Sequence, residues 1–309
     1  MAVQIGTTVS RESGRQTLAR ARSRAALIPD LLVEASRIAN NVFSGWHGRR
    51  KRGIGENFWQ FRHYIGGEPV SAIDWRRSAR DNQLYIRDRE WQAAHTVWLW
   101  VDESPSMLYK SEVAQVSKQS RALVLAFAMA DLLARSGERI GWLGLTRPMV
   151  SRNAAEKLAS ILVSSQPQTE IPDTSDLRRF ADVILFSDFL DPVEKTIEKI
   201  TKIARFGIRG HLVQIIDPAE QSFPYGGRVE FDDPETGLRV TTGNAQNISV
   251  EYKNLFNARI QKLRSQTIKL GWSHSVHQTD SLASQALVAL HTNLSGNTAH
   301  SINNPNGAK

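Results

Sequence analysis

Oxygen-bearing side chains are concentrated in one short segment, Asp102-Glu103-Ser104-Pro105-Ser106. Asp102, Ser104 and Ser106 are two residues apart, so an extended turn can direct one carboxylate and two hydroxyls towards the same point. Mg²⁺ and Mn²⁺ prefer oxygen ligands of this kind, and three of them are too few to complete an octahedron. The segment therefore predicts a site for Mg²⁺ or Mn²⁺ whose remaining positions are filled by water and by a carboxylate of another protein.

A second carboxylate is placed in the same way along the chain. Asp102 follows the apolar segment 96–101, and Asp188 ends the apolar segment 182–188. In an open parallel α/β sheet the functional crevice lies beyond the carboxyl ends of the strands, where the strand order reverses. We therefore expect Asp102 and Asp188 to meet. Thr174 is a further candidate ligand, with Thr169 as the alternative, because both precede the second strand.

A simpler interpretation gives the same residues a structural role. Ser104 or Ser106 would cap the helix that follows, and Asp102 would stabilise the positive end of its dipole. The short pattern D-x-S-x-S is weak support for a metal site when it stands alone. The second aspartate at a strand end favours the cation site over the cap.

From residue 96 onwards the chain alternates between apolar strands and helices, a pattern typical of a doubly wound, mostly parallel α/β sheet flanked by helices. The predicted strands cover residues 96–101, 139–145, 182–188, 210–217 and 273–278, and the predicted helices cover 111–136, 154–164, 193–205, 249–270 and 282–294. A hairpin is predicted to join 228–233 to 238–242, across a turn that contains glycine.

The first third of the chain has a different character. Residues 16–44 have helical spacing, and the interruption at Pro29-Asp30 predicts two short helices. The segment that follows is basic and aromatic, and it predicts short strands and turns. The sequence thus predicts a disordered tail (1–15), an N-terminal helical and basic aromatic lobe (16–95), the α/β domain (96–295) and a second disordered tail (296–309).

The formal charge of +8 is unevenly distributed, because residues 1–95 hold 16 Lys and Arg against 9 Asp and Glu. A basic lobe can attract nucleic acid, an acidic protein surface or anionic lipid. Acidic residues are interleaved with the aromatic ones, which favours an architectural role over base stacking. Arginines suit the bidentate recognition of carboxylates, so Arg76, Arg77 and Arg80 are candidate partner-binding residues.

Several classes of function are disfavoured. The chain has no cysteine, which excludes thiol chemistry and fits a reducing compartment. The N-terminus has no apolar segment typical of a signal peptide, and residues 122–134 are too short to span a bilayer. We therefore expect a cytoplasmic protein without a membrane span. Common nucleotide-binding, zinc-protease and serine-hydrolase motifs are absent from the sequence.

The segment Asp102-Glu103-Ser104-Pro105-Ser106-Met107 resembles the metal-ion-dependent adhesion site of von Willebrand factor A domains, in which D-x-S-x-S is followed by a threonine and an aspartate. More of the chain resembles a bacterial family, the domain of unknown function numbered fifty-eight, which is described beside MoxR-type AAA+ ATPases. The most specific element is the block Ile73-Asp74-Trp75-Arg76-Arg77-Ser78-Ala79-Arg80. Further shared elements are Arg52-Gly53-Ile54-Gly55-Glu56, Ser187-Asp188-Phe189, Asp217-Pro218, Glu235-Thr236-Gly237 and Thr279-Asp280.

This resemblance implies a von Willebrand factor A-like fold and a non-enzymatic, metal-dependent protein-binding module that works with a MoxR-like ATPase. Two departures bear on the site. The interval from Thr174 to Asp188 is short for the family, which leaves the threonine ligand open, and Glu103 replaces a small residue. Glu103 can compete as a ligand or raise the local negative charge, and we place it with the candidate partner-binding residues.

Two other functions stay open at the sequence level. The first is a metal-dependent phosphohydrolase with Asp102 as nucleophile, although Ser104 stands where that chemistry normally needs a second acid. The second is nucleic-acid binding through the basic N-terminal lobe, which would show a steep salt dependence.

Overall fold

The computed structural model describes residues 14–47, 60–66, 70–80, 83–88, 94–172 and 176–301. The chain divides into two compact units. One is Gly45–Ala94, and the other combines Met1–Ser44 with His95–Lys309. Each unit is described separately.

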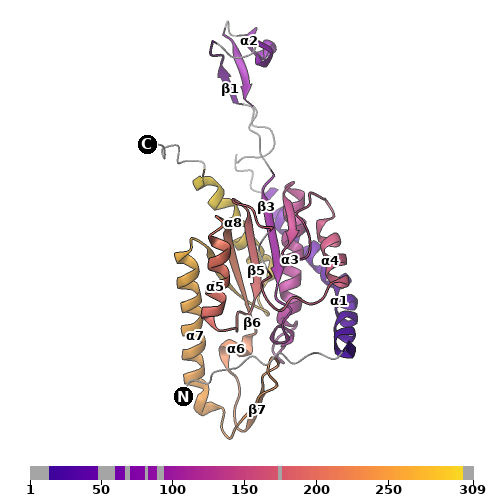
Figure 1. The fold of residues 1–309 in the computed structure, drawn as a ribbon, viewed down its shortest axis with the longest axis vertical. Coiled ribbons are helices and arrows are strands. Elements are labelled where there is room, and N and C mark those ends of the chain that lie inside the picture. The colour runs from indigo at the N-terminus through magenta and orange to yellow at the C-terminus, as the bar shows by residue number, and fades with distance from the viewer. Residues whose placement is uncertain are drawn as a thin grey trace. The chain divides into compact units, whose positions relative to one another are not determined.

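The larger unit is built on a sheet of five parallel strands, as the sequence predicted (Figure 1). The strands are β3 (Thr96–Val101), β4 (Arg139–Trp142), β5 (Asp182–Ser187), β6 (Arg209–Ile216) and β9 (Ser273–Gln278). Their order is β4-β3-β5-β6-β9, so the chain moves outwards from β3 to β4 and then returns to the other side of β3. The loops after β3 and β5 therefore diverge, and the strand order reverses between them.

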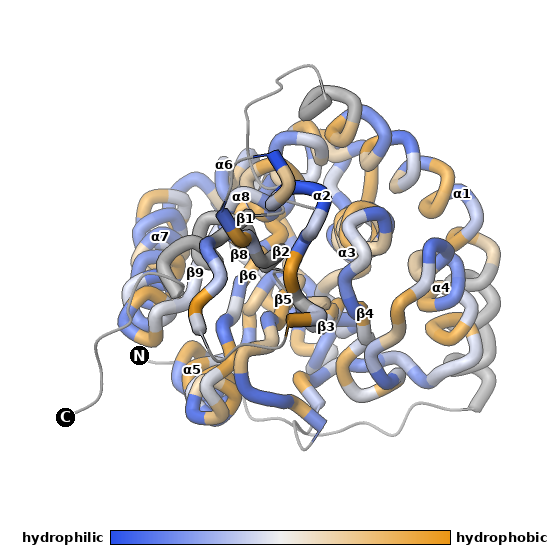
Figure 2. Tube along the Cα trace, turned by 90° about the horizontal axis from the view of Figure 1, so that it is seen from above, coloured by the Kyte–Doolittle hydropathy of each residue, from blue (hydrophilic) through white to orange (hydrophobic). Residues whose placement is uncertain are grey.

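Burial on both faces explains why the central strands are apolar throughout. Every residue of β5 and all but the first of β3 are buried. The edge strand β9, with the sequence SHSVHQ, is mostly half-buried because it pairs on one side alone. Figure 2 shows hydrophobic residues along the central strands and a mixed pattern along the outer helices.

Helices cover both faces of this sheet. Side chains of α5 and α7 join a hydrophobic core with β3, β5 and β6, whereas α3 packs against α4 and α8 (Figure 2). The helices are α3 (Lys118–Arg135), α4 (Ala154–Ser164), α5 (Val193–Ala204), α6 (Pro218–Ser222), α7 (Gln246–Lys269) and α8 (Ala283–Ser301). None of the helices in the described part of the chain is long and apolar enough to cross a membrane.

The N-terminal helix corrects two expectations. Helix α1 (Gly14–His47) is continuous, so the predicted break at Pro29 is wrong. Pro29 is exposed, where water can satisfy the carbonyl that its missing N–H leaves free, and the buried face continues past it. Helix α1 also belongs to the larger unit, with Glu34 3.5 Å from Arg121 and Asn40 2.7 Å from Arg135. Residues 16–95 are therefore not one lobe.

Helix boundaries also differ from the prediction, and one short helix was not predicted. Helix α3 begins at Lys118 rather than at 111, because the Ser117 hydroxyl caps it by accepting from the Ser120 N–H, and Val113 is 61% exposed. Helix α8 continues to Ser301, into the predicted tail. The short α6 was not predicted; it begins at a capping box formed by Asp217 and Glu220.

The smaller unit contains short strands and turns, as expected. Strands β1 (Gln60–His63) and β2 (Tyr85–Asp88) are antiparallel, and η1 (Val70–Ala72) and α2 (Trp75–Ser78) lie between them in sequence. The Asp74 carboxylate caps α2 by accepting from the Arg77 N–H at 3.0 Å. Trp75 is 59% exposed, so it does not contribute to an aromatic core in this unit.

Candidate functional site

Asp102 is the first residue after β3, and the pairing of β3 with β5 fixes its position. Val101 is paired with Phe186, and the Asp102 N–H continues the ladder by donating to the Phe186 carbonyl at 2.9 Å. This register places Asp102 beside Ser187, whose hydroxyl donates to Asp102 Oδ2 at 2.7 Å. The carboxylate is therefore held at the end of β5, on the neighbouring strand.

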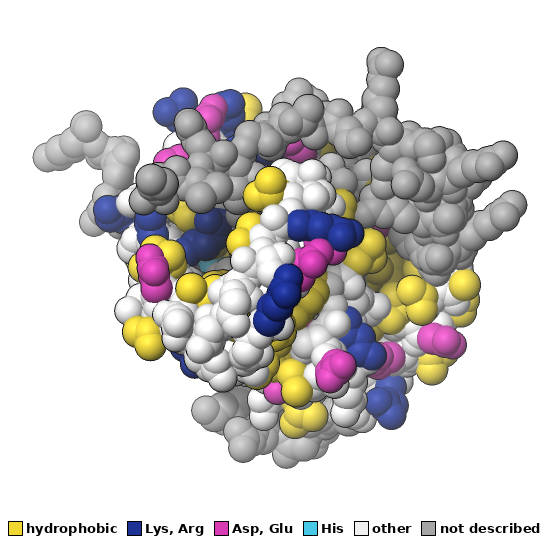
Figure 3. All heavy atoms as spheres, turned by 90° about the horizontal axis from the view of Figure 1, so that it is seen from below, with side chains coloured by type: hydrophobic (Ala, Val, Ile, Leu, Met, Phe, Trp, Pro, Cys, Tyr) yellow, Lys and Arg dark blue, Asp and Glu magenta, His cyan; other side chains and the backbone are white. Residues whose placement is uncertain are grey.

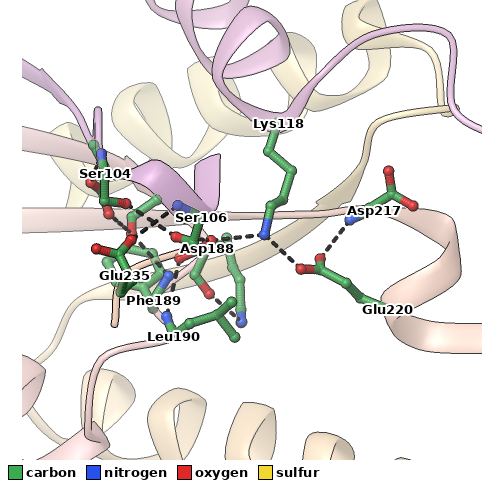
Figure 4. A network of polar contacts seen from close by, with 12 residues as sticks. Ser104, Ser106, Lys118, Asp188, Phe189, Leu190, Asp217, Glu220 and Glu235 are labelled. Atoms are coloured by element: carbon green, nitrogen blue, oxygen red, sulfur yellow. Dashed lines mark hydrogen bonds and ion pairs between the residues drawn. The ribbon is translucent and has the colours of Figure 1, made fainter. Parts of the chain in front are cut away.

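The two serines connect Asp102 to Asp188 through hydrogen bonds, and Figure 4 shows Ser104, Ser106 and Asp188 close together. The Ser104 N–H donates to Asp102 Oδ1 at 2.9 Å, and the Ser104 and Ser106 hydroxyls are 3.1 Å apart. The Ser106 hydroxyl donates to Asp188 Oδ2 at 2.8 Å. None of these four side chains belongs to a residue more than 8% exposed. Four of the predicted ligands therefore meet at the carboxyl ends of β3 and β5, where the strand order reverses.

A strained turn directs Asp188 towards the serines. The next residue, Phe189, has φ 50°, a left-handed conformation that costs roughly 1–2 kcal/mol for a residue other than glycine. Its N–H donates to Ser187 Oγ at 2.9 Å, and its carbonyl accepts from Arg259 of α7 at 2.6 Å. The Leu190 N–H adds a bond to Asp188 Oδ1 at 3.1 Å. These contacts hold the strained conformation, and the carboxylate is fixed as a result.

The charge on Asp102 is poorly compensated. Burial, and secondarily the nearby charge of Asp188, raises the pKa of Asp102 from 3.8 to about 7, against the opposing hydrogen bonds from Ser187 and Ser104. No ion pair forms with Asp102 among the described residues. A carboxylate without a countercharge, beside two hydroxyls and a second carboxylate, is a donor set that fits a hard divalent cation.

Asp188, in contrast, has a countercharge that the sequence analysis missed. Lys118 is fully buried, and its Nζ lies 2.8 Å from Asp188 Oδ2 and 2.6 Å from Glu220 Oε1 (Figure 4). Burial acts to lower the pKa of Lys118, but the two carboxylates outweigh it and raise this pKa, so the lysine stays charged. The available signal was its position: a lysine in the first turn of a helix opposes the helix dipole and needs a compensating partner.

Glu103 and the candidate threonines lie differently from the expectation. Glu103 is 2% exposed, and its Oε2 accepts from the Gln168 N–H at 3.1 Å, so its carboxylate joins two loops and is not presented to a partner. Thr169 is exposed, and among the described residues no hydrogen bond connects it to Asp102, Ser104, Ser106 or Asp188. Thr174 lies outside the described residues.

The predicted partner-binding arginines belong to the smaller unit. Arg76 and Arg80 are exposed, and Arg77 is half-buried with its guanidinium 5.2 Å from the centre of the Tyr85 ring. The residues whose hydrogen bonds form the cluster around Asp102 belong to the larger unit.

One acidic residue reaches the cluster from far along the chain. Glu235 lies in the turn of the hairpin formed by β7 (Val229–Asp232) and β8 (Arg239–Thr242), which the sequence predicted. Its Oε1 accepts from the Ser106 N–H at 3.0 Å (Figure 4). In the sequence, Glu235 is part of a segment that supports the family resemblance, and no role was predicted for it.

The donor set combines carboxylates with hydroxyls. Within the described ranges, no three His, Cys, Asp or Glu residues are grouped closely enough to hold a metal by themselves. Any cation here would therefore depend on Ser104 and Ser106 as well as on Asp102 and Asp188.

The fold and the cluster together define a parallel α/β protein with an acidic, hydroxyl-lined site where the strand order reverses. The chain belongs to the family described as "Protein of unknown function DUF58", whose profile matches residues 60–262.

The chain is also similar to several individual proteins. The chain is 25% identical over 232 residues to "Uncharacterized protein Rv1480" of Mycobacterium tuberculosis (strain ATCC 25618 / H37Rv) and to "Uncharacterized protein Mb1516" of Mycobacterium bovis, covering 69% of this chain and 72% of each relative. It is similar to the crystal structure of conserved hypothetical protein BatB from Bacteroides thetaiotaomicron, at 15% identity and a TM-score of 0.38, over 66% of this chain and 98% of that one. An aerotolerance-related membrane protein from Bacteroides fragilis gives 12% identity and a TM-score of 0.36, over 66% and 100%.

The raised pKa of Asp102 predicts that this carboxylate destabilises the cation-free protein at high pH. Because its pKa is about 7 in the folded state and 3.8 ordinarily, the cost is fully present above pH 7 and disappears as the pH falls towards 4. In EDTA at pH 8, Asp102→Asn should therefore be more stable than wild type, by on the order of a few kcal/mol, with no such gain near pH 4. Urea unfolding across this range measures it, with the exposed Asp232→Asn as control. A wild type at least as stable as Asp102→Asn at pH 8 would contradict the prediction.

Lys118 is predicted to be indispensable for stability. Lys118→Met keeps an apolar side chain of similar length but leaves Asp188 and Glu220 without their buried cation. We expect the free energy of unfolding to fall by roughly 3–5 kcal/mol. Lys202→Met is the control, since both partners of its pair with Glu198 are more than 60% exposed and it should change stability by about 0–1 kcal/mol. Equal urea midpoints for the two variants would refute this role.

Proposed function

We propose that this protein is a non-enzymatic protein-binding module that depends on a divalent cation, Mg²⁺ or Mn²⁺. Asp102, Ser104, Ser106 and Asp188 would hold the ion through oxygen. The ion would supply an electrophilic centre for a carboxylate of the partner, with water in the remaining positions. Binding would then require both the cation and an acidic residue on the partner.

The observation that carries this proposal is that side-chain oxygens from two separate loops are joined by hydrogen bonds. The Ser106 hydroxyl lies 3.1 Å from the Ser104 hydroxyl and 2.8 Å from Asp188 Oδ2, while Asp102 receives bonds from the Ser104 N–H and the Ser187 hydroxyl. A simple helix cap does not account for this arrangement. Ser104 makes no side-chain capping bond to η2 (Pro105–Leu108), and the cap of α3 is Ser117.

The charges around the cluster also favour a divalent ion. When ionised, Asp102, Asp188, Glu220 and Lys118 carry a net charge of −2, because Lys118 compensates one of three carboxylates. Two positive charges would balance the group. Lys118 and Asp102 then have distinct roles. Lys118 pairs with Asp188 and holds it in place, whereas the negative charge of Asp102 has no cationic partner in the cluster and would bind the ion.

Glu235 supports the chemistry proposed for the partner. Its carboxylate comes from a distant hairpin and accepts from the Ser106 N–H, which shows that a carboxylate fits against this side of the loop. The proposed partner is a MoxR-like AAA+ ATPase. The family resemblance supports this partner, and the oxygen-lined cluster supports a carboxylate as the group that it would supply.

Thermal unfolding with and without cation tests the site. Binding to the folded state alone should raise the stability of wild type by about 2.7 kcal/mol at a hundredfold excess of Mg²⁺ or Mn²⁺ over its dissociation constant. Asp102→Ala should show no shift relative to its own midpoint in EDTA, and Asp232→Ala should behave as wild type. Unchanged wild-type midpoints would contradict the proposal. Sustained Asp102-dependent phosphatase turnover with Mg²⁺ would replace the binding module with an enzyme.

Binding to a MoxR-like ATPase from the same genome tests the partner. We expect the two proteins to form a complex on size exclusion in Mg²⁺, and we expect EDTA or Asp102→Ala to abolish it, because the bridging ion is then lost. Asp232→Ala should leave the complex intact. A complex that persists in EDTA would show that the interface does not use the cation.

A further inference from the structure

The tip of the β7–β8 hairpin is a preformed turn that presents Glu235. The Asp233 N–H donates to the Leu238 carbonyl at 2.8 Å, and the Gly237 N–H donates to the Asp233 carbonyl at 2.7 Å. The Asp233 carboxylate accepts from the Glu235 N–H at 2.9 Å and from the Thr236 hydroxyl at 2.5 Å. Gly237 has φ 70°, which a side chain would strain. The backbone of Glu235 is therefore fixed by the turn itself.

The base of the hairpin is attached to the larger unit by aromatic packing. The Phe231 ring stacks on Phe223 at 5.8 Å and meets Tyr225 edge-on at 5.4 Å. The Tyr225 hydroxyl lies 2.6 Å from that of Tyr109, which directly follows η2 in the loop of residues 102–109, called the cation loop below. The hairpin is thus anchored next to the loop that carries Ser106.

Beyond this base, the hairpin is largely solvated. Leu238 and Val240 are 53% and 55% exposed, and Arg239 forms surface ion pairs with Glu230 and Asp232. Figure 3 shows this end of the molecule from below, with basic and acidic side chains close together among hydrophobic ones. Exposed ion pairs contribute little, about 0–1 kcal/mol each, so the pairs of Arg239 add little to the attachment of the hairpin.

Glu235 meets the residue that joins the two halves of the candidate site. Ser106 donates its hydroxyl to Asp188 Oδ2 and its N–H to Glu235 Oε1. One oxygen of the Glu235 carboxylate is thereby fixed to the cation loop, and no hydrogen bond is recorded for its other oxygen within the described residues. The exposed Glu235 carboxylate is thus held beside Ser106, at the edge of the cluster, and is not grouped with Asp102 and Asp188 as closely as three ligands of one ion.

We propose that Glu235 is an intrachain ligand that takes the position assigned above to the partner's carboxylate, so a partner must exchange its own acid for Glu235. This inference rests on the proposed cation site. The hairpin would then raise the affinity of the isolated chain for the cation. It would also select for partners whose acidic residue displaces Glu235 from the ion. An ion held in part by Glu235 would keep fewer waters than one held by the loop residues alone.

Mn²⁺ itself is the probe for this inference, measured by calorimetry and by water-proton relaxation. Glu235→Gln keeps an oxygen that can accept the Ser106 N–H, so the variant removes the charge while retaining the hydrogen bond. We expect its dissociation constant for Mn²⁺ to rise about tenfold, because affinity follows the number of charged ligands. We also expect bound Mn²⁺ to relax water more strongly in the variant, since water replaces Glu235. Added acetate should reverse this increase in the variant and should leave the relaxation of wild type unchanged.

Glu230→Gln is the matched control. Glu230 lies on the same hairpin, is exposed, and forms a surface ion pair with Arg239. Its affinity and relaxation should equal those of wild type. If Glu235→Gln also equals wild type while Asp102→Ala abolishes Mn²⁺ binding, Glu235 merely fastens the hairpin, and the inference is wrong although the cation site stands. If wild type shows no Asp102-dependent binding of Mn²⁺, both are wrong.

Discussion

Two carboxylates are buried at the carboxyl ends of neighbouring strands, and the surrounding structure compensates for their charges unequally. Asp102 and Asp188 are 8% and 2% exposed. An isolated buried carboxylate is costly unless it is hydrogen-bonded, paired or neutralised. The parallel pairing of β3 and β5 places the two residues together, at the point where the reversal of strand order leads their loops apart.

The compensation differs between the two acids, and this asymmetry supports the functional proposal. Asp188 has a buried lysine, two hydrogen bonds and a strained turn behind it, which fix its position. Asp102 has hydrogen bonds but no cation, and its pKa is raised to about 7. A protein that needed only a stable loop would gain by replacing Asp102 with a neutral residue. Retaining an uncompensated carboxylate at this point is consistent with binding an ion there.

The sequence predicted those parts of the structure that depend on local pattern. Helix α4 has the predicted bounds, and the two strand-terminal aspartates meet because parallel strands end on the same edge. Contacts between distant segments were missed. The partners of Lys118 lie 70 and 102 residues away, and Glu235 lies 129 residues from Ser106. Pro29 misled the helix prediction because its cost depends on whether its face is solvated, which spacing alone does not determine.

The most direct measurement is anomalous diffraction at the manganese edge from crystals of the protein equilibrated with MnCl₂. The account predicts a peak bounded by the oxygens of Asp102, Ser104, Ser106 and Asp188, with Glu235 or water on its open side. The absence of a peak there, or a peak only at surface carboxylates such as Asp232, would contradict the claim that these two loops form a cation site.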